Sequence, residues 1–118
     1  MADHGIFIGW RFPARGREEA AVKVFGELIQ LLTAQAQQRN IESLEPCFLQ
    51  AHGGDLGGFV LVKGERAKLD QLVASDEFQR LITRAQTVVE NFGVVNALFG
   101  QEVQKTMATY LPDTADLR

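Results

Sequence analysis

His52 is the residue of this chain whose type and position best suit acid–base chemistry. Its imidazole titrates near neutral pH, which suits a general base or a ligand to haem or a metal ion. The competing interpretation is a polar residue at a strand end beside a turn. His4 lies next to the N-terminus, and we expect no role for it. With Cys47 these are the soft-ligand candidates, and because their spacing matches no zinc signature we expect no metal site.

Arg11, Gln50 and Asn96 are the polar side chains that would orient a ligand together with His52. A buried guanidinium needs a partner. Arg11 therefore binds a carboxylate or phenolate of a ligand, pairs with an acid of a second subunit, or reaches solvent at the end of its strand. Asn96 stands in an apolar strand, where its amide must form hydrogen bonds with a ligand, with water, or with Gln50 and His52.

Four aromatic residues, Trp10, Phe25, Phe78 and Tyr110, are candidates for lining a cleft between a sheet and its helices. Trp10 adds an indole N–H, which usually finds an acceptor when it is buried. The alternative is that these residues belong to an ordinary core. The glycine-rich run from His52 to Gly58 lacks the Gly-Lys-Ser/Thr of a phosphate-binding loop, so we expect a hairpin turn there.

Hydrophobic periodicity predicts the strands that position these residues. Apolar side chains alternate over the sequence GIFIGWRF, which predicts a strand over 5–12. Further apolar stretches predict strands over 44–51, 59–63 and 92–99. Pro46 has no N–H to donate to a neighbouring strand, so the second of these strands belongs at a sheet edge.

Apolar residues at helical spacing predict the helices. A long helix is expected over 21–36, and Asn40 suits the left-handed position that closes it. After Gly64 a second helical region follows, with a fresh start at Ser75, which is a good N-cap, and an apolar face that continues to Val89. A short helix is expected before Pro112.

The order β-α-β-β-α-β with a terminal helix is the split βαβ, or ferredoxin-like, pattern. It predicts one α+β domain over residues 1–118, with a four-stranded antiparallel sheet, two main helices on one face and a short C-terminal helix. A chain of 118 residues has the usual length of one domain. The other face of the sheet is left without cover.

Strand parity assigns the sheet residues to two faces. The face expected under the helices holds Ile6, Ile8, Trp10, Phe12, Cys47, Leu49, Ala51, Val60, Val62, Val95, Ala97 and Phe99. The face expected to be bare holds Phe7, Gly9, Arg11, Phe48, Gln50, His52, Phe59, Leu61, Val94, Asn96 and Leu98. Monomers rarely expose so large an apolar patch. Burying its six large apolar side chains would contribute on the order of 10 kcal/mol before the cost of association. A homodimer through this open sheet face is therefore expected.

The pattern is similar to that of the dimeric α+β barrel superfamily. The stretch LVASDEFQRL (72–81) resembles the opening of that superfamily's second helix, and GGFVLVKG (57–64) resembles the strand before it. The resemblance covers roughly Gly5 to Gly100. It implies a ferredoxin-like dimer, in a superfamily that includes cofactor-independent monooxygenases, haem-degrading enzymes, isomerases and stress-induced proteins.

Composition and charge narrow the function. The net charge of −3 disfavours nucleic-acid binding, which needs an excess of Lys and Arg. The chain holds no apolar run long enough to span a membrane. One cysteine and no signal-peptide pattern at the N-terminus favour the cytoplasm.

The expectation is a cytoplasmic homodimer that binds a small apolar or aromatic molecule without a cofactor. One alternative is a cofactor-independent monooxygenase or isomerase of an aromatic or quinone-like substrate, with His52 as its base. Another is a non-catalytic stress-related or structural interaction module.

Overall fold

A computed structural model describes residues 2–118 of the chain. Its four strands are β1 (His4–Trp10), β2 (Ser43–Phe48), β3 (Gly58–Gly64) and β4 (Gly93–Leu98). The helices are α1 (Glu18–Gln37), α2 (Arg66–Ala74), α3 (Asp76–Gln86), α4 (Gln101–Ala108) and α5 (Tyr110–Asp113), followed by the 3₁₀ turn η1 (Ala115–Leu117).

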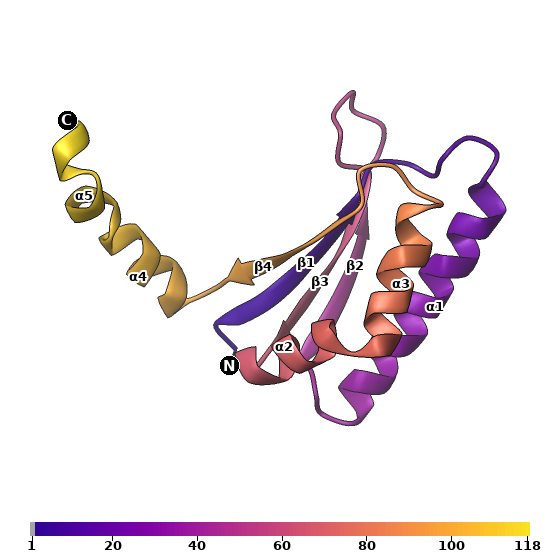
Figure 1. Ribbon diagram of the computed structural model, residues 1–118, viewed down its shortest axis with the longest axis horizontal. Helices are drawn as coiled ribbons and strands as arrows, with labels where there is room; N and C mark the ends of the chain where they lie inside the picture. Colours follow the sequence, from indigo (N-terminus) through magenta and orange to yellow (C-terminus); the bar gives the residue numbers. More distant parts are fainter. Residues whose placement is uncertain (1) are drawn as a thin grey trace.

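The strands form one antiparallel sheet in the order β2-β3-β1-β4. This order and the two helical crossings confirm the ferredoxin-like α+β fold. Pro46 lies in β2, at an edge of the sheet as predicted. Figure 1 shows α1, α2 and α3 on one side of the sheet, and no helix of the described chain packed on the other.

The core lies between the sheet and its helices. Ile6 and Ile8 of β1 pair with Val62 and Val60 of β3, and all four side chains are essentially inaccessible to water. Helix α1 contributes Leu28 and Leu32 along one stripe, as its 3.6-residue periodicity requires, and α3 contributes Phe78 and Leu81.

The register corrects the predicted faces of the two outer strands. Leu44, Pro46 and Phe48 of β2 share the helix side with Val62 and Val60, so Cys47 lies on the open face with Phe59. In β4 the same reversal occurs, since Asn96 lies opposite Ile6 and Val95 lies opposite Phe7. The predictions for His4–Trp10 of β1 and for β3 are confirmed, whereas those for Cys47, Phe48 and residues 94–99 are wrong by one residue.

The open face remains largely apolar with this correction, and Ser43, Glu45 and Lys63 are the polar residues of β2 and β3 that share it. Phe7 stacks on Phe59, with ring centroids 5.1 Å apart, and Leu61 and Val95 are their neighbours. Phe99 completes this surface, because its ring lies where a Cβ on Gly5 would stand and 4.5 Å from the Lys63 ammonium. We call the apolar residues of this side, Phe7, Cys47, Phe59, Leu61, Val95, Ala97 and Phe99, the open face.

The helix ends differ from expectation in two places. Arg39, not Asn40, takes the left-handed conformation after α1 (φ 62°). Val88 and Val89 do not continue α3, which ends at Gln86; Val88 is nevertheless buried, and Val89 bridges to Pro13. The start at Ser75 is confirmed, since its hydroxyl accepts a hydrogen bond from the Phe78 N–H at 3.2 Å.

The C-terminal helices form an arm that leaves the sheet at β4. We define the arm as residues 101–118. Figure 1 shows it separated from the body, on the side of the sheet away from α1 and α3. The radius of gyration, 16.3 Å, exceeds the roughly 13.5 Å of a compact chain of this length. The short helix expected before Pro112 is present as α4, and a further turn, α5, runs through Pro112 itself.

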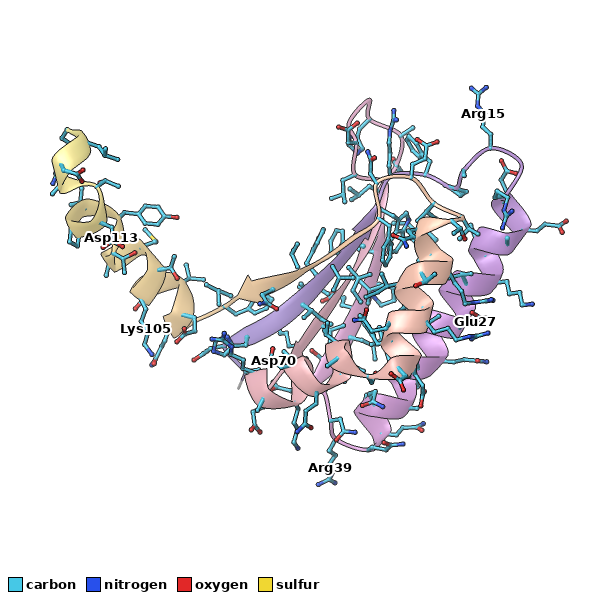
Figure 2. All side chains as sticks on the ribbon, viewed as in Figure 1. Arg15, Glu27, Arg39, Asp70, Lys105 and Asp113 are labelled. Carbon is cyan, nitrogen blue, oxygen red and sulfur yellow. The ribbon has the colours of Figure 1, made fainter. Side chains whose placement is uncertain are left out.

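An ion pair joins the two long helices. The Arg84 guanidinium of α3 donates two hydrogen bonds, of 2.9 and 2.8 Å, to the Glu27 carboxylate of α1. Figure 2 shows Glu27 on the helix layer. These hydrogen bonds hold the pKa of Glu27 below its ordinary value, although desolvation of the carboxylate acts in the opposite direction.

Because the folded pKa is the lower one, this pair stabilises the fold above the ordinary pKa of a glutamate, ~4.3. The contribution disappears as the pH falls through the folded pKa. We expect Glu27→Gln to lower the free energy of unfolding at pH 7 and to match the wild type in strong acid. Denaturant titrations at several pH values measure this, with Glu42→Gln as the exposed control. A loss that persists unchanged in strong acid would contradict the assignment.

Candidate functional site

An apolar cavity of about 380 Å³ lies between the sheet and its helices, at the end where β1 stops. Trp10, the last residue of β1, reaches into the space above Gly58, where a Cβ would stand 2.8 Å from the indole ring. The absence of a side chain at Gly58 is thus what admits Trp10. The cavity lining comprises Trp10, Arg11, Phe12, Pro13, Ala21, Val22, Val24, Phe25, Leu28, Phe48, Leu49, Gly57, Phe78, Leu81, Ile82, Ala85, Val88, Val89 and Phe92.

Aromatic rings form one wall of the cavity. Trp10 contacts Phe25 and Phe48 edge-on, at centroid distances of 5.8 and 6.1 Å, and Phe25 lies 5.2 Å from Phe48. Phe78 is fully buried at the base. The structure therefore brings together three of the four predicted aromatic residues, whereas Tyr110 lies exposed on the arm.

The mouth of the cavity is open and apolar. Val22 of α1 and Phe48 of β2 are 72% and 69% exposed, and Phe12 and Leu49 are also exposed. Sequence reasoning missed Phe48 here because it placed this residue on the other face of the sheet. We call Phe12, Val22, Phe48 and Leu49 the mouth.

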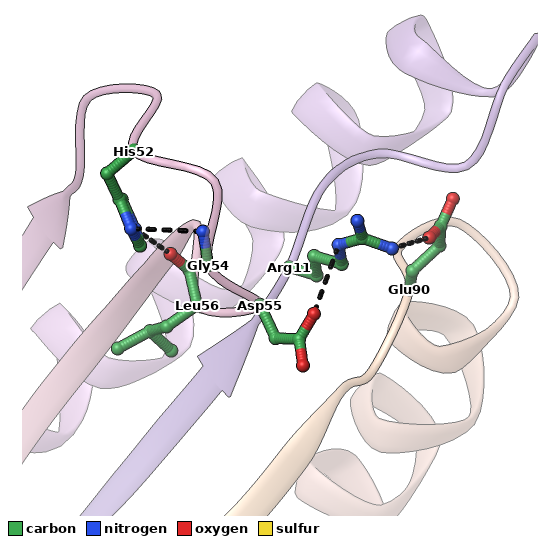
Figure 3. A network of polar contacts seen from close by, with 6 residues as sticks. All are labelled: Arg11, His52, Gly54, Asp55, Leu56 and Glu90. Carbon is green, nitrogen blue, oxygen red and sulfur yellow. Dashed lines mark hydrogen bonds and ion pairs between the residues drawn. The ribbon is translucent and has the colours of Figure 1, made fainter.

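Among the described residues that line the cavity, Arg11 alone is charged. Its position on the helix side corrects the prediction that it lies on the bare face, because β1 ends at Trp10 and strand parity does not extend to Arg11. Its guanidinium stands 3.4 Å from the Glu90 carboxylate and 3.7 Å from that of Asp55 (Figure 3). It also lies over the Phe12 ring, 5.2 Å from the centroid. The Nε atom is buried yet has no hydrogen-bond partner. The contact with Asp55 is too long for a hydrogen bond, so it does not satisfy this N–H.

His52 belongs to the loop between β2 and β3 rather than to the cavity lining. Its Nδ1 accepts a hydrogen bond from the Gly54 N–H at 3.2 Å, and its Nε2 lies 2.9 Å from the Leu56 carbonyl oxygen (Figure 3). A neutral ring with its hydrogen on Nε2 satisfies both contacts. These contacts suit the interpretation of His52 as a polar residue that orders the turn.

The remaining polar candidates are not gathered at one point. Gln50 is exposed in the same loop as His52, and Asn96 is exposed on β4, outside the cavity lining. His4 is 4.0 Å from Glu102 at the start of the arm. In residues 2–118 no cluster of three or more His, Cys, Asp or Glu side chains is arranged to hold a metal ion. Over the same residues no helix has the length and apolar character needed to cross a membrane.

Comparison with known proteins identifies the fold but no family. No protein-family model matches the sequence, and no curated protein does. Among solved structures, a hydroxynitrile lyase from Passiflora edulis aligns with a TM-score of 0.68 at 7% identity, covering 84% of this chain and 94% of that one.

Two bacterial structures give the same result. A dimeric ferredoxin-like protein of unknown function from Thermobifida fusca has a TM-score of 0.64 at 9% identity, with 83% of this chain and 92% of that chain covered. A DABB family protein with a ferredoxin-like fold from Mesorhizobium loti has a TM-score of 0.63 at 12% identity, with 83% and 97% covered. The chain thus has the fold of dimeric ferredoxin-like proteins, as the sequence resemblance implied.

The loop contacts of His52 predict a structural effect of its removal. We expect His52→Ala to lower the free energy of unfolding by about 1 kcal/mol, because the Gly54 N–H and the Leu56 carbonyl lose their partner. Denaturant unfolding measures the change, and Gln50→Ala in the same loop serves as the neutral control. Equal stability of the two variants would show that these hydrogen bonds do not order the turn.

Proposed function

We propose that this chain is a homodimer that binds a small apolar or aromatic molecule in the cavity between its sheet and helices. The observation that carries the proposal is the apolar lining of a cavity of about 380 Å³, which lies in the size range of small-molecule sites. Water is held weakly in a cavity with this lining, because few polar groups are present to form hydrogen bonds with it. An apolar ligand would instead recover the contacts that the lining side chains lack.

The ligand we propose has one polar group at its end nearest Arg11. The partly exposed guanidinium of Arg11 suits an acceptor such as a carboxylate or a phenolate. The Asp55 and Glu90 carboxylates already offset the positive charge of Arg11. The polar group of the ligand therefore contributes more to the ligand's orientation than to its affinity. Roles for Gln50, His52 and Asn96 in holding the ligand stay predictions.

The dimer is proposed from the open face. Its apolar side chains belong to strands that are buried on the opposite side by the helices, so only another molecule can cover them. Structures of the same fold are described as dimeric, which favours a second copy as that molecule. We take residues 1–118 as one domain of this dimer, and its free thiol, Cys47, suits a reducing cytoplasm.

Catalysis is a separate question. A lyase shares this fold, and the resemblance implied an oxygenase or isomerase, but a fold alone does not assign an activity. A role for His52 as base in such a reaction stays a prediction. We therefore propose binding as the function, because the cavity supports it without a reaction.

The dimer predicts the effect of a charge on the open face. Val95 is 57% exposed in one chain, so Val95→Glu should leave the fold intact and yield a monomer at micromolar concentration. Asn96→Glu, one residue along on the other side of β4, should remain dimeric. Sedimentation equilibrium distinguishes the two. A wild-type monomer at these concentrations would refute the dimer.

The cavity predicts the effect of filling it. Trp10 is the only tryptophan of the chain, so its fluorescence reports on the cavity directly. We expect phenylbutanol to change Trp10 emission saturably in the wild type and at least ten-fold more weakly in Ala85→Leu, which adds volume to the lining. Ala74→Leu, at the exposed end of α2, is the control. Identical titrations of all three proteins would place the binding elsewhere.

A further inference from the structure

The arm presents an apolar stripe that its own chain does not cover. Val103, Met107, Tyr110 and Leu111 recur at helical spacing, and the last three are more than 60% exposed. Helices this short are not stable alone in water, so the arm needs a surface to pack against. Figure 1 shows that the body of the same chain does not provide one.

Several contacts hold the start of the arm in a direction that leads away from its own sheet. The Phe99 N–H donates to the Asp3 carbonyl at 2.8 Å, and the Phe99 ring covers Gly5. Gly100 is left-handed (φ 54°), and a Cβ there would stand 2.6 Å from a carboxylate oxygen of Asp3. Two residues later, Glu102 lies 3.0 Å from Lys105 and 4.0 Å from His4. These contacts join the strand, the linker and the first helical turn.

The fixed direction points to a second copy as the occupant. The arm follows β4, and Val95 and Ala97 of that strand belong to the open face. The arm therefore begins beside the surface through which the dimer is proposed to form. The space between the arm and the open face is where a facing sheet would lie. Any chain that sits there receives the arm against its own body.

The mouth of the cavity is the apolar surface that matches the arm. Outside β4 and the arm, the large exposed apolar side chains in the described residues are Phe12, Val22, Phe48 and Leu49, which together form the mouth. The arm starts beside His4 and the cavity lies at Trp10, at opposite ends of β1. In a dimer whose two-fold axis runs across the strands, the start of one arm would therefore lie at the cavity end of the other chain. Exchange of the two arms would cover both apolar surfaces at once.

We propose that the arm of each copy packs across the mouth of the other copy's cavity, where it adds Tyr110 to the binding site. This inference rests on the proposed dimer and cavity, and goes beyond them by making each site a product of both chains. It also places the predicted fourth aromatic residue at the cleft, supplied by the partner. The aligned structures cover 83–84% of this chain, which leaves a length close to that of the arm.

The first test places charges on the stripe in the full-length chain. Met107→Asp combined with Leu111→Asp should raise the dimer dissociation constant at least ten-fold and shift Trp10 emission to the red, because water reaches the mouth. Gln104→Asp combined with Ala108→Asp charges the more polar side of the same helix and should change neither quantity. If the stripe variant keeps both wild-type values, the proposal is overturned.

The second test locates the arm. Tyr110 is replaced by photoreactive benzoylphenylalanine, and the protein is mixed with an isotopically labelled copy before irradiation. We expect cross-links between chains that map near Val22 and Phe48. Cross-links within one chain, or between chains but away from the mouth, would overturn the arm exchange while leaving the dimer and the cavity in place. A wild type that stays monomeric would instead refute the proposed dimer, and this inference with it.

Discussion

The central strands β1 and β3 carry apolar side chains on both faces, and the rest of the molecule follows from that. Ile6, Ile8, Val60 and Val62 require a helix layer, which α1 and α3 supply. Phe7, Phe59 and Leu61 point the other way, and no helix within residues 2–118 returns to cover them. A strand pair of this kind satisfies one hydrophobic face by folding and the other only by association.

The cavity arises where the helix layer is incomplete. Helix α3 ends at Gln86, and the segment to Gly93 turns across the end of the sheet instead of extending the helical cover. Two backbone hydrogen bonds between Glu90 and the residues after β1 hold this segment, and Arg11 ties Glu90 and the loop of Asp55 to the same corner. Aromatic rings then line the gap instead of filling it. The site thus lies where β1 and α3 end and beside the loop of Asp55, so no single sequence motif marks it.

The fold could be predicted from the sequence to a much greater extent than the site, and the hydrophobic pattern of the sheet explains both results. Periodicity located all four strands and the start of α3, because burial on the helix side fixes a clear pattern. The faces of β2 and β4 were predicted wrongly because both faces of this sheet are apolar. A one-residue shift of Phe48 or Val95 then leaves the hydrophobic pattern almost unchanged. Phe48 was missed as a cavity residue for this reason, whereas Trp10 and Phe25, on elements of unambiguous phase, were found.

The arm connects the open face with the cavity. Its helices can be anticipated from spacing, but its direction depends on Gly100 and on the contacts of Phe99 and Glu102, which no local pattern reveals. If each mouth is closed by the partner's arm, the closed cavity exists only in the dimer. A ligand that prefers the closed cavity must then stabilise the dimer by the same free energy that dimerisation adds to its binding. Ligand binding in the cavity and dimerisation through the open face are then thermodynamically coupled.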